Sequence, residues 1–225
     1  MAAWWLLRKQ QGWVSDMNAK RGLFIVFEGV DGCGKTTQAR NLAAKMQGLG
    51  CSVVLTREPG GTEIGGKLRQ LLLLDDCTPA WETEVLLMAA DRAQHVAEVL
   101  KPALANGAVV ISDRYVYSSL AYQGFGAQRP YEAVREVNNL AMQGLVPHLT
   151  IFLAIPPDNR YLRPEKEDRI ERRGLEYQQR VYEGFRYLAD NDPNCATLEV
   201  VGRDEADVAD LVWRICLERF PDLLI

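Results

Sequence analysis

Five short runs of apolar, β-prone residues recur along the chain, and longer stretches with helical periodicity separate them. Most of the runs show no alternation of apolar and polar positions, which is typical of parallel strands covered on both faces. The predicted strands are Leu23–Phe27, Val53–Leu55, Val109–Ile111, Leu149–Leu153 and Leu198–Val201. The predicted helices are Lys35–Gly48, Ile64–Leu74, Glu82–Ala105, Tyr131–Gln143, Gly174–Ala189 and Ala206–Phe220.

The alternation of these elements predicts a doubly wound α/β domain, in which helices cover both faces of a five-stranded parallel sheet. No internal repeat or low-complexity linker interrupts the pattern, so a single domain is expected over residues 22–225. Polar segments follow the strands, namely Gly29–Thr36, Arg57–Gly61, Asp113–Tyr115, an arginine-rich stretch after Pro157, and Gly202–Asp204. Because parallel sheets bind ligands beyond the carboxyl ends of their strands, these segments predict one site at one edge.

The composition is ordinary for a globular protein and argues against two kinds of partner. The 225 residues are 48% hydrophobic and 25% charged, and the formal net charge is −4. A nucleic-acid-binding protein normally carries a basic excess on at least one face, so no nucleic acid polymer is expected as a partner. No apolar run approaches the ~20 residues that a bilayer-spanning helix needs, so no membrane association is expected. The five cysteines are far apart, which favours a reducing compartment and a cytoplasmic protein.

The segment Gly29–Thr36 matches the phosphate-binding pattern G-x-x-x-x-G-K-[ST] between a predicted strand and a predicted helix. Its glycines let backbone N–H groups turn toward phosphate oxygens, and the helix N-terminus adds its dipole. Lys35 is expected to reach the β- and γ-phosphates of ATP. The residues expected to bind ATP are Gly29, Val30, Asp31, Gly32, Cys33, Gly34, Lys35, Thr36, Thr37 and Arg203. No Asn-Lys-x-Asp motif for guanine is present, which disfavours a GTPase.

Four segments resemble, in the same order, motifs of the thymidylate kinase family, and the resemblance runs from about Leu23 to the C-terminus. They are Phe27–Gln38, Arg57–Thr62, Ala89–His95 and Asp113–Gly124. The resemblance implies a three-layer P-loop NTPase fold with a short lid over the nucleotide. It also implies a Mg²⁺-dependent, homodimeric enzyme that converts dTMP and ATP to dTDP and ADP.

The resemblance gives several residues an expected role around dTMP. Asp31 is expected to bind the 3′-hydroxyl of the acceptor sugar, and Arg57 and Arg114 its phosphate. The other expected contacts are Arg92 at a thymine carbonyl, Ser119 and Gln123 near the base, and Tyr122 beneath the deoxyribose. The expected catalytic residues are Asp31, Lys35, Asp113 and Arg114, together with arginines of the lid.

Three oxygen-bearing residues are candidates for binding Mg²⁺. Thr36 is expected to bind the ion through its hydroxyl, and Glu58 and Asp113 directly or through water. The alternative for Asp113 is a purely structural ion pair with Arg114. The alternative for Glu58 is a role in capping a turn.

Arg92 can also be judged from its place in a predicted helix. An inward stripe at helical spacing is formed by Val85, Met88, Arg92, Val96, Val99 and Ala103. An arginine in the middle of such a stripe is costly unless it is paired, which favours a contact with a bound base. The alternative is an arginine that extends along the surface and keeps its guanidinium in water.

The basic segment of residues 157–173 is expected to form the lid. In one branch of the family an arginine follows the loop aspartate, whereas the other branch has glycine there and places basic residues in the lid. This chain has Gly32, so it resembles the second branch, and the candidates for a catalytic lid arginine are Arg160, Arg163 and Arg169. The alternative is a solvated, charged helix.

Three features depart from the family pattern. The lid is short between Pro157 and Asp168, and Pro164 interrupts any helix through it. Met88 stands where many members place a phenylalanine that stacks on the base, so weaker binding or broader selectivity for dTMP is expected. Residues 1–21, which include Trp4 and Trp5, form an N-terminal extension that the resemblance does not cover. Either translation begins at Met17, which we favour, or the extension packs on the dimer or on a partner.

Two other functions fit parts of the pattern. The first is a kinase for another nucleoside or nucleoside monophosphate. The second is a nucleotide-binding regulator that transfers no phosphoryl group. The presence of Lys35, Thr36, Asp113 and Arg114 argues against the regulator.

Overall fold

The protein is described here by a computed structural model, which covers residues 22–73, 78–159 and 172–221. Its strands are β1 (Leu23–Glu28), β2 (Val53–Arg57), β3 (Val109–Asp113), β4 (Leu149–Ala154) and β5 (Cys195–Glu199). They form one parallel sheet in the order β2-β3-β1-β4-β5. The predicted α/β class with a five-stranded parallel sheet is therefore confirmed.

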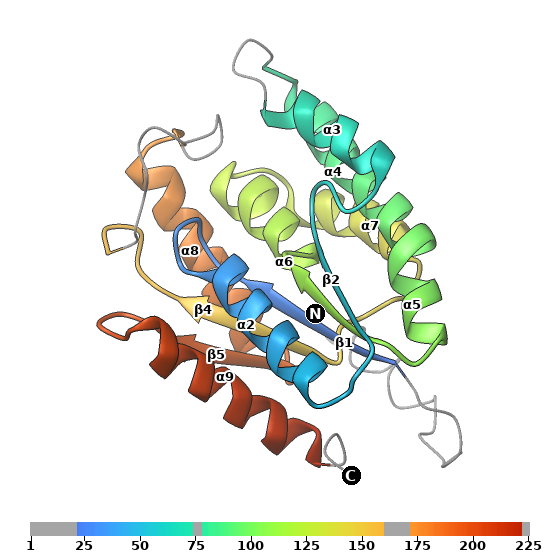
Figure 1. The fold of residues 1–225 in the computed structure, drawn as a ribbon. Helices are drawn as coiled ribbons and strands as arrows, with labels where there is room; N and C mark the ends of the chain where they lie inside the picture. Colours follow the sequence, from blue (N-terminus) through green and yellow to red (C-terminus); the bar gives the residue numbers. More distant parts are fainter. Residues whose placement is uncertain (1–21, 74–77, 160–171, 222–225) are drawn as a thin grey trace.

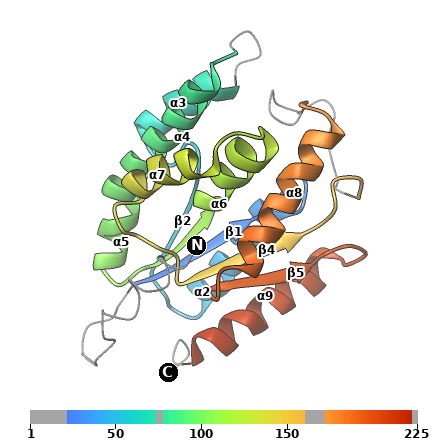
Figure 2. The same ribbon diagram turned by 180° about the vertical axis from the view of Figure 1, so that it is seen from behind.

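Helices cover both faces of the sheet. The α-helices are α2 (Lys35–Gly48), α3 (Glu63–Leu73), α4 (Trp81–His95), α5 (Lys101–Ala105), α6 (Val116–Ser119), α7 (Tyr131–Met142), α8 (Leu175–Asp190) and α9 (Glu205–Arg219). Two π-helical stretches, η1 (Val96–Leu100) and η2 (Leu120–Gly126), continue α4 and α6. Helices α2 and α9 lie on one face of the sheet (Figure 1), and α6, α7 and α8 lie on the other (Figure 2).

The core lies on both sides of the central strands. All six residues of β1 and all six of β4 are buried, as expected for strands with helices on both faces. The parallel register places Phe27 beside Asp113, and Asp113 beside Arg57 on the far side of β3. The segments that follow β1, β2 and β3 therefore leave the sheet at the same edge, as the sequence predicts.

Two predictions about elements were wrong in detail. The fifth strand is Cys195–Glu199 and not Leu198–Val201, because pairing with β4 fixes it, from Thr150 opposite Cys195 to Ala154 opposite Glu199. The helical segment Val116–Gly126 was not predicted as a helix. It is short and rich in serine, tyrosine and glycine, which have modest or poor helix propensity, and it is stabilised by packing against α8.

Two predicted features fall partly or wholly on residues that the structure does not describe. They are the N-terminal extension of residues 1–21 and residues 160–171 of the lid, including Arg160, Arg163 and Arg169. Among the helices that are described, none combines the length and the apolarity needed to cross a bilayer.

Candidate active site

The phosphate-binding loop connects the end of β1 to the start of α2. Gly29 has a φ of 142°, and a Cβ at this position would lie 2.7 Å from the Leu153 carbonyl oxygen, so only glycine fits there. Gly34, with a φ of 95°, precedes the first residue of α2. Lys35 Nζ donates to the Val30 carbonyl oxygen at 2.7 Å, which holds the ammonium group over the loop. The N-terminus of α2 and this ammonium group together form a site for phosphate oxygens.

Thr36 and Asp113 bring two kinds of oxygen ligand together beside this loop. The Thr36 hydroxyl donates to Oδ2 of Asp113, which stands at the end of β3. The other carboxylate oxygen, Oδ1, is buried and has no hydrogen-bond partner within the described residues. A hydroxyl and a carboxylate with free capacity fit a hard divalent cation such as Mg²⁺, which is usually held by one or two carboxylates and by substrate phosphates. The described residues contain no cluster of three or more His, Cys, Asp or Glu side chains for a metal.

Asp31, Arg114 and Tyr122 form a second group of interacting side chains at the loop. Arg114 has a φ of 76°, an uncommon value for a residue other than glycine, and Nη1 donates to Ser118 Oγ at 2.8 Å. Its Nη2 is ion-paired with Asp31, which also accepts a hydrogen bond of 2.7 Å from the Tyr122 hydroxyl. Burial would raise the pKa of Asp31, but the charges of Arg114 and Lys35 outweigh it and hold this pKa well below its usual value.

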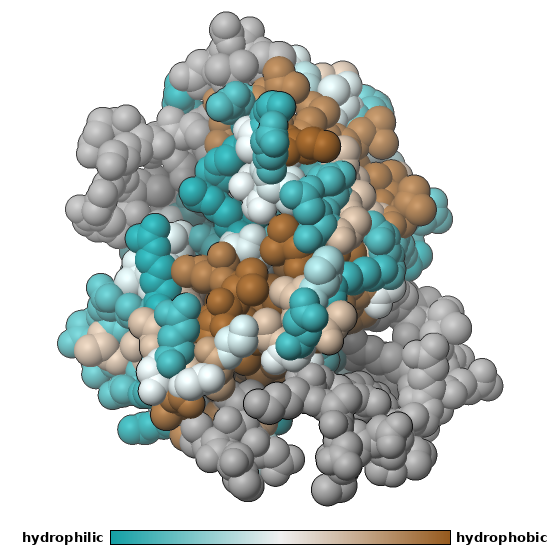
Figure 3. Space-filling model, turned by 45° about the vertical axis from the view of Figure 1, so that its right-hand side comes forward, coloured by the Kyte–Doolittle hydropathy of each residue, from teal (hydrophilic) through white to brown (hydrophobic). Residues whose placement is uncertain are grey.

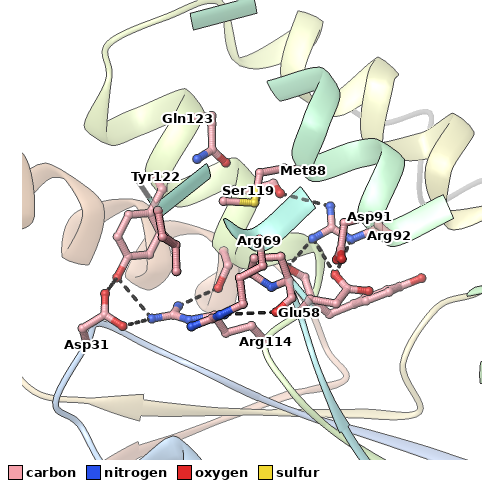
Figure 4. Close-up of a pocket in the computed structure, with 14 residues that line it drawn as sticks. Asp31, Glu58, Arg69, Met88, Asp91, Arg92, Arg114, Ser119, Tyr122 and Gln123 are labelled. Carbon is pink, nitrogen blue, oxygen red and sulfur yellow. Dashed lines mark hydrogen bonds and ion pairs between the residues drawn. The ribbon is translucent and has the colours of Figure 1, made fainter. Parts of the chain in front are cut away.

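Two clefts meet at Asp31 and Arg114. The first borders the phosphate-binding loop and is lined by Asp31, Gly32, Gly34, Lys35, Thr36, Thr37, Arg57, Glu58, Arg69, Asp113 and Arg114. The second extends toward α4 and η2, and its lining includes Met88, Arg92, Ser119, Tyr122 and Gln123 (Figure 4). Seven of the eight residues expected to contact dTMP line the second cleft, namely Asp31, Met88, Arg92, Arg114, Ser119, Tyr122 and Gln123. The eighth, Arg57, lines the first cleft and not the second.

A third cleft lies on the far side of the loop. It is lined by Gly32, Cys33, Gly34 and Thr37 from the loop and the start of α2, and by Gly202 and Arg203 after β5. Arg203 Nε donates to the Glu199 carbonyl oxygen at 2.9 Å and the residue is exposed. The end of the fifth strand therefore lies beside the loop, as the sequence predicts.

Arg92 is buried, with 2% exposure, so the alternative of a surface-extended arginine is wrong. All five N–H groups of its guanidinium have partners. The acceptors are Glu58 for Nε and Nη2, Ser119 and Asn138 for Nη1, and the Tyr115 carbonyl oxygen for Nη2. In this structure Arg92 therefore joins the loop after β2 to α6 and α7, and it lines the cleft without a free donor.

Glu58 has a role that the sequence did not predict. Its Oε2 accepts from Arg92, and its Oε1 lies 2.9 Å from His95 Nδ1. His95 is fully buried and is also 2.7 Å from the Thr56 hydroxyl through its second ring nitrogen. With both carboxylate oxygens engaged, Glu58 holds the loop after β2 against α4.

Four further residues of the site were missed in the sequence. Asp91 accepts a hydrogen bond of 2.8 Å from Gly60 N, and burial together with the charge of Glu58 raises its pKa to about 6. Arg69 lines both clefts and donates to the Pro59 carbonyl oxygen at 3.0 Å. The other two are Glu84 and Asn138, both buried. The sequence offered a signal for Glu84 and Asp91, because each is an acidic residue next to a member of the inward stripe of a predicted helix. Nothing local distinguished Arg69 or Asn138.

Fold and site together define a P-loop kinase, which sets the triphosphate of a nucleotide against a second, phosphate-bearing molecule. A family model described as thymidylate kinase matches residues 27–210. The chain belongs to the thymidylate kinase family.

Individual relatives agree with this assignment. The chain is 44% identical over 200 residues to a thymidylate kinase of Synechococcus sp. (strain JA-2-3B'a(2-13)), covering 88% of this chain and 96% of that protein. It is 48% identical over 179 residues to a thymidylate kinase of Trichormus variabilis, covering 77% and 85%. The crystal structure of thymidylate kinase from Ehrlichia chaffeensis superposes with a TM-score of 0.72 at 30% identity, covering 87% and 98%.

Proposed function

We propose that this protein phosphorylates dTMP to dTDP with ATP and Mg²⁺. Membership of the thymidylate kinase family supports the proposal. The structural observation that carries it is the meeting of two clefts at Asp31 and Arg114, one bordered by the phosphate-binding loop and one by Met88, Ser119 and Gln123. This arrangement suits two substrates that must bring their phosphates together.

The acceptor needs little chemical activation. Its phosphate is already a dianion, so one of its oxygens attacks the γ-phosphorus of ATP without a strong general base. That oxygen forms a bond to the γ-phosphorus, the bond from the γ-phosphorus to the bridging oxygen breaks, and ADP leaves. Because the substrates repel each other, the enzyme acts by alignment and charge neutralisation. We assign Lys35 to the β- and γ-phosphates, and Arg57 and Arg114 to the acceptor phosphate.

Mg²⁺ supplies the charge that neutralises the β- and γ-phosphate oxygens. We assign it to Thr36 and Asp113, whose oxygens are in contact and whose carboxylate keeps a buried oxygen without a partner among the described residues. Glu58 is not assigned to the metal ion, because its two carboxylate oxygens already contact Arg92 and His95.

The second cleft is assigned to the nucleoside of dTMP. Met88, Ser119 and Gln123 line the part proposed for the base, and Tyr122 the part proposed for the deoxyribose. Arg92 forms the wall of this cleft, and a contact to a thymine carbonyl would need one of its donors to exchange, such as the 3.0 Å bond to Ser119.

The remaining assignments concern ATP and the cell compartment. Thr37 and Arg203 are assigned to the nucleotide because they line the third cleft. Residues 157–173 are assigned to a lid, and this rests on their sequence. The reaction is assigned to the cytoplasm, in keeping with the four described cysteines, which are free thiols.

An acceptor screen tests the proposed function. ADP release would be measured with ATP and Mg²⁺ across dTMP, dUMP, dCMP, dGMP and thymidine. We expect the highest kcat/KM with dTMP, and loss of turnover when Mg²⁺ is chelated. Equal turnover across the acceptors would favour a kinase for another nucleotide, and ATP binding without turnover on any acceptor would favour a regulator.

We also propose that the enzyme is a homodimer that buries the outer faces of α4 and α7. On α4 and η1, the residues Leu86, Ala90, Ala93 and Ala97 form an apolar stripe that is exposed or half-buried. On α7, Ala133, Val137 and Leu140 form a second stripe, and Leu140 is 83% exposed. Gln143 Nε2 donates to the Ala93 carbonyl oxygen, which keeps the two helices together. Figure 3 shows such apolar patches on the side of the molecule that carries these helices.

Sedimentation of a charged variant tests the dimer. We expect Leu140→Lys to sediment as a monomer at micromolar concentration, because a lysine in an apolar interface would lose its hydration. The matched control is Leu49→Lys, at an exposed leucine just after α2. A dimer that persists in Leu140→Lys, or a wild-type enzyme that sediments as a monomer, would contradict the proposal.

A further inference from the structure

Glu84 is a buried carboxylate in contact with Gln123, which lines the acceptor cleft, and the reaction assigned above does not use it. It lies on α4 one turn before Met88 and is 2% exposed. Gln123 Nε2 donates to its Oε1 at 3.0 Å, and Arg173 donates to its Oε2. A buried ion pair is a weak source of stability, because desolvation of the charges offsets their attraction. The contact of Glu84 with a residue that lines the cleft calls for a different explanation.

The contact with Glu84 decides which end of the Gln123 carboxamide faces the cleft. A carboxamide has an N–H donor end and a C=O acceptor end, whereas a carboxylate only accepts hydrogen bonds. Glu84 therefore holds the NH₂ end of Gln123 and leaves Oε1 for the cleft that this residue lines. Among the described residues this oxygen accepts no hydrogen bond, and Figure 4 shows it on the side of Met88 and Ser119.

Arg173 keeps Glu84 in this orientation. Its guanidinium lies over the ring of Tyr177, 5.1 Å from the centroid, and donates to the Tyr177 hydroxyl at 3.1 Å. The Tyr177 hydroxyl in turn donates to the Tyr122 carbonyl oxygen at 3.0 Å. A guanidinium can only donate, so it always takes an oxygen from residue 84 and turns the other end of that side chain toward Gln123.

We propose that Glu84 is a positioning residue that sets the base selectivity of the acceptor cleft. Because Glu84 fixes the Gln123 carboxamide, the cleft presents Gln123 Oε1 to the base as a hydrogen-bond acceptor. Thymine and uracil carry an N–H at position 3, whereas cytosine has a lone pair there. The proposal rests on the proposed function, since it assumes that the base of the acceptor lies beside Gln123. It predicts selection of dTMP and dUMP against dCMP, and no selection between dTMP and dUMP by this contact.

The variant Glu84→Gln tests the proposal because it nearly preserves shape and reverses the hydrogen-bond pattern. Arg173 takes the new carboxamide oxygen, so the NH₂ of residue 84 faces Gln123, which must turn its own NH₂ toward the cleft. We expect the kcat/KM ratio of dTMP to dCMP to fall about tenfold or more, because an unpaired polar group then faces thymine. The dTMP to dUMP ratio and the KM for ATP stay at wild-type values. The matched control is Glu82→Gln, at an exposed position on the same helix, which keeps every ratio.

A swapped double variant provides the rescue. In Glu84→Gln/Gln123→Glu the NH₂ of residue 84 meets a carboxylate at 123, and an acceptor oxygen again faces the cleft. We expect the dTMP to dCMP ratio to return toward the wild-type value. If Glu84→Gln does not fold, Glu84→Asp is the second variant, because it keeps the charge and shortens the side chain by one methylene. We expect about a threefold fall in the same ratio.

Several outcomes would overturn the role of Glu84. They are an unchanged dTMP to dCMP ratio in a folded Glu84 variant, no rescue by the swap, or an equally large change in the dTMP to dUMP ratio. A wild-type enzyme that turns over dTMP while the variant keeps its selectivity rejects this role alone. A wild-type enzyme that does not use dTMP rejects the proposed function as well.

Discussion

Glu28, the last residue of β1, holds the backbone around Arg114 in place. It is 1% exposed, accepts a hydrogen bond from Tyr115 N at 2.8 Å, and binds the Ser118 hydroxyl at 2.6 Å. Burial raises its pKa from 4.5 to about 7, although Ser118 and Arg114 act in the opposite direction. The folded protein therefore binds this proton more tightly than the unfolded chain does.

This shift predicts a pH dependence of stability. Because the pKa is higher in the folded state, the contribution of Glu28 is greatest below pH 4.5 and is lost as the pH rises toward about 7. We expect the free energy of unfolding of the wild type to fall across this range relative to Glu28→Gln, by at most about 1.4 kcal/mol per pH unit. Urea titrations at several pH values measure the difference. Curves that stay parallel for the two proteins would contradict the raised pKa.

Asp113 makes a prediction about metal dependence. Asn in its place keeps the size and removes the charge next to Thr36, so Mg²⁺ should bind more weakly at the nucleotide. We expect Asp113→Asn to need a higher Mg²⁺ concentration for half-maximal activity and to lose about tenfold or more in kcat. Titration of activity with MgCl₂ measures both. The same half-maximal concentration in variant and wild type would remove Asp113 from the metal site.

At the scale of elements, the packing of α8 against η2 supports the acceptor cleft, because Tyr122 and Gln123 lie on η2. Gly184 is the close-contact point on α8, where an added Cβ would lie 2.8 Å from Cβ and Cγ of Phe125. Cβ and Cγ of Phe125 are so close to the backbone of η2 that they cannot move aside unless η2 itself shifts. The overlap should outweigh the gain in helix propensity that alanine brings.

We therefore expect Gly184→Ala to lower the free energy of unfolding by about 1 kcal/mol or more. Gly66→Ala is the matched control, because Gly66 lies inside α3 with no atom near the added methyl group. That variant should raise stability by about 0.5–1 kcal/mol. Denaturant unfolding measures both, and changes of the same sign in the two variants would contradict the packing argument.

The elements also show what the sequence could predict. The phosphate-binding loop was predictable because its chemistry depends on eight consecutive residues, Gly29–Thr36, between a strand and a helix. The partners of Arg92 were not, because Glu58, Ser119 and Asn138 come from three separate elements that only the folded chain brings together. The stripe on α4 correctly indicated that this arginine is buried and paired. It could not indicate that the partners are protein groups.

At the scale of the whole molecule, the sheet register brings the separate segments into one site. The ends of β1, β2 and β3 lie side by side (Figure 1). Residues of α4, α6 and η2 supply much of the lining of the acceptor cleft. The location of the site at one edge of the sheet could be predicted from the alternation of strands and helices alone. The contacts between Glu84, Gln123 and Arg173 could not be predicted, since they depend on how α4, η2 and the start of α8 pack.

The proposed reaction requires a triphosphate and an acceptor phosphate to meet between Lys35 and Arg114. A crystal structure of the enzyme with Mg²⁺, a non-hydrolysable ATP analogue and dTMP tests this most directly. We predict the γ-phosphate beside Lys35, the dTMP phosphate at Arg57 and Arg114 in line with it, and the thymine between Met88 and Gln123. Either ligand bound outside these clefts, or the two phosphates turned away from each other, would contradict the account.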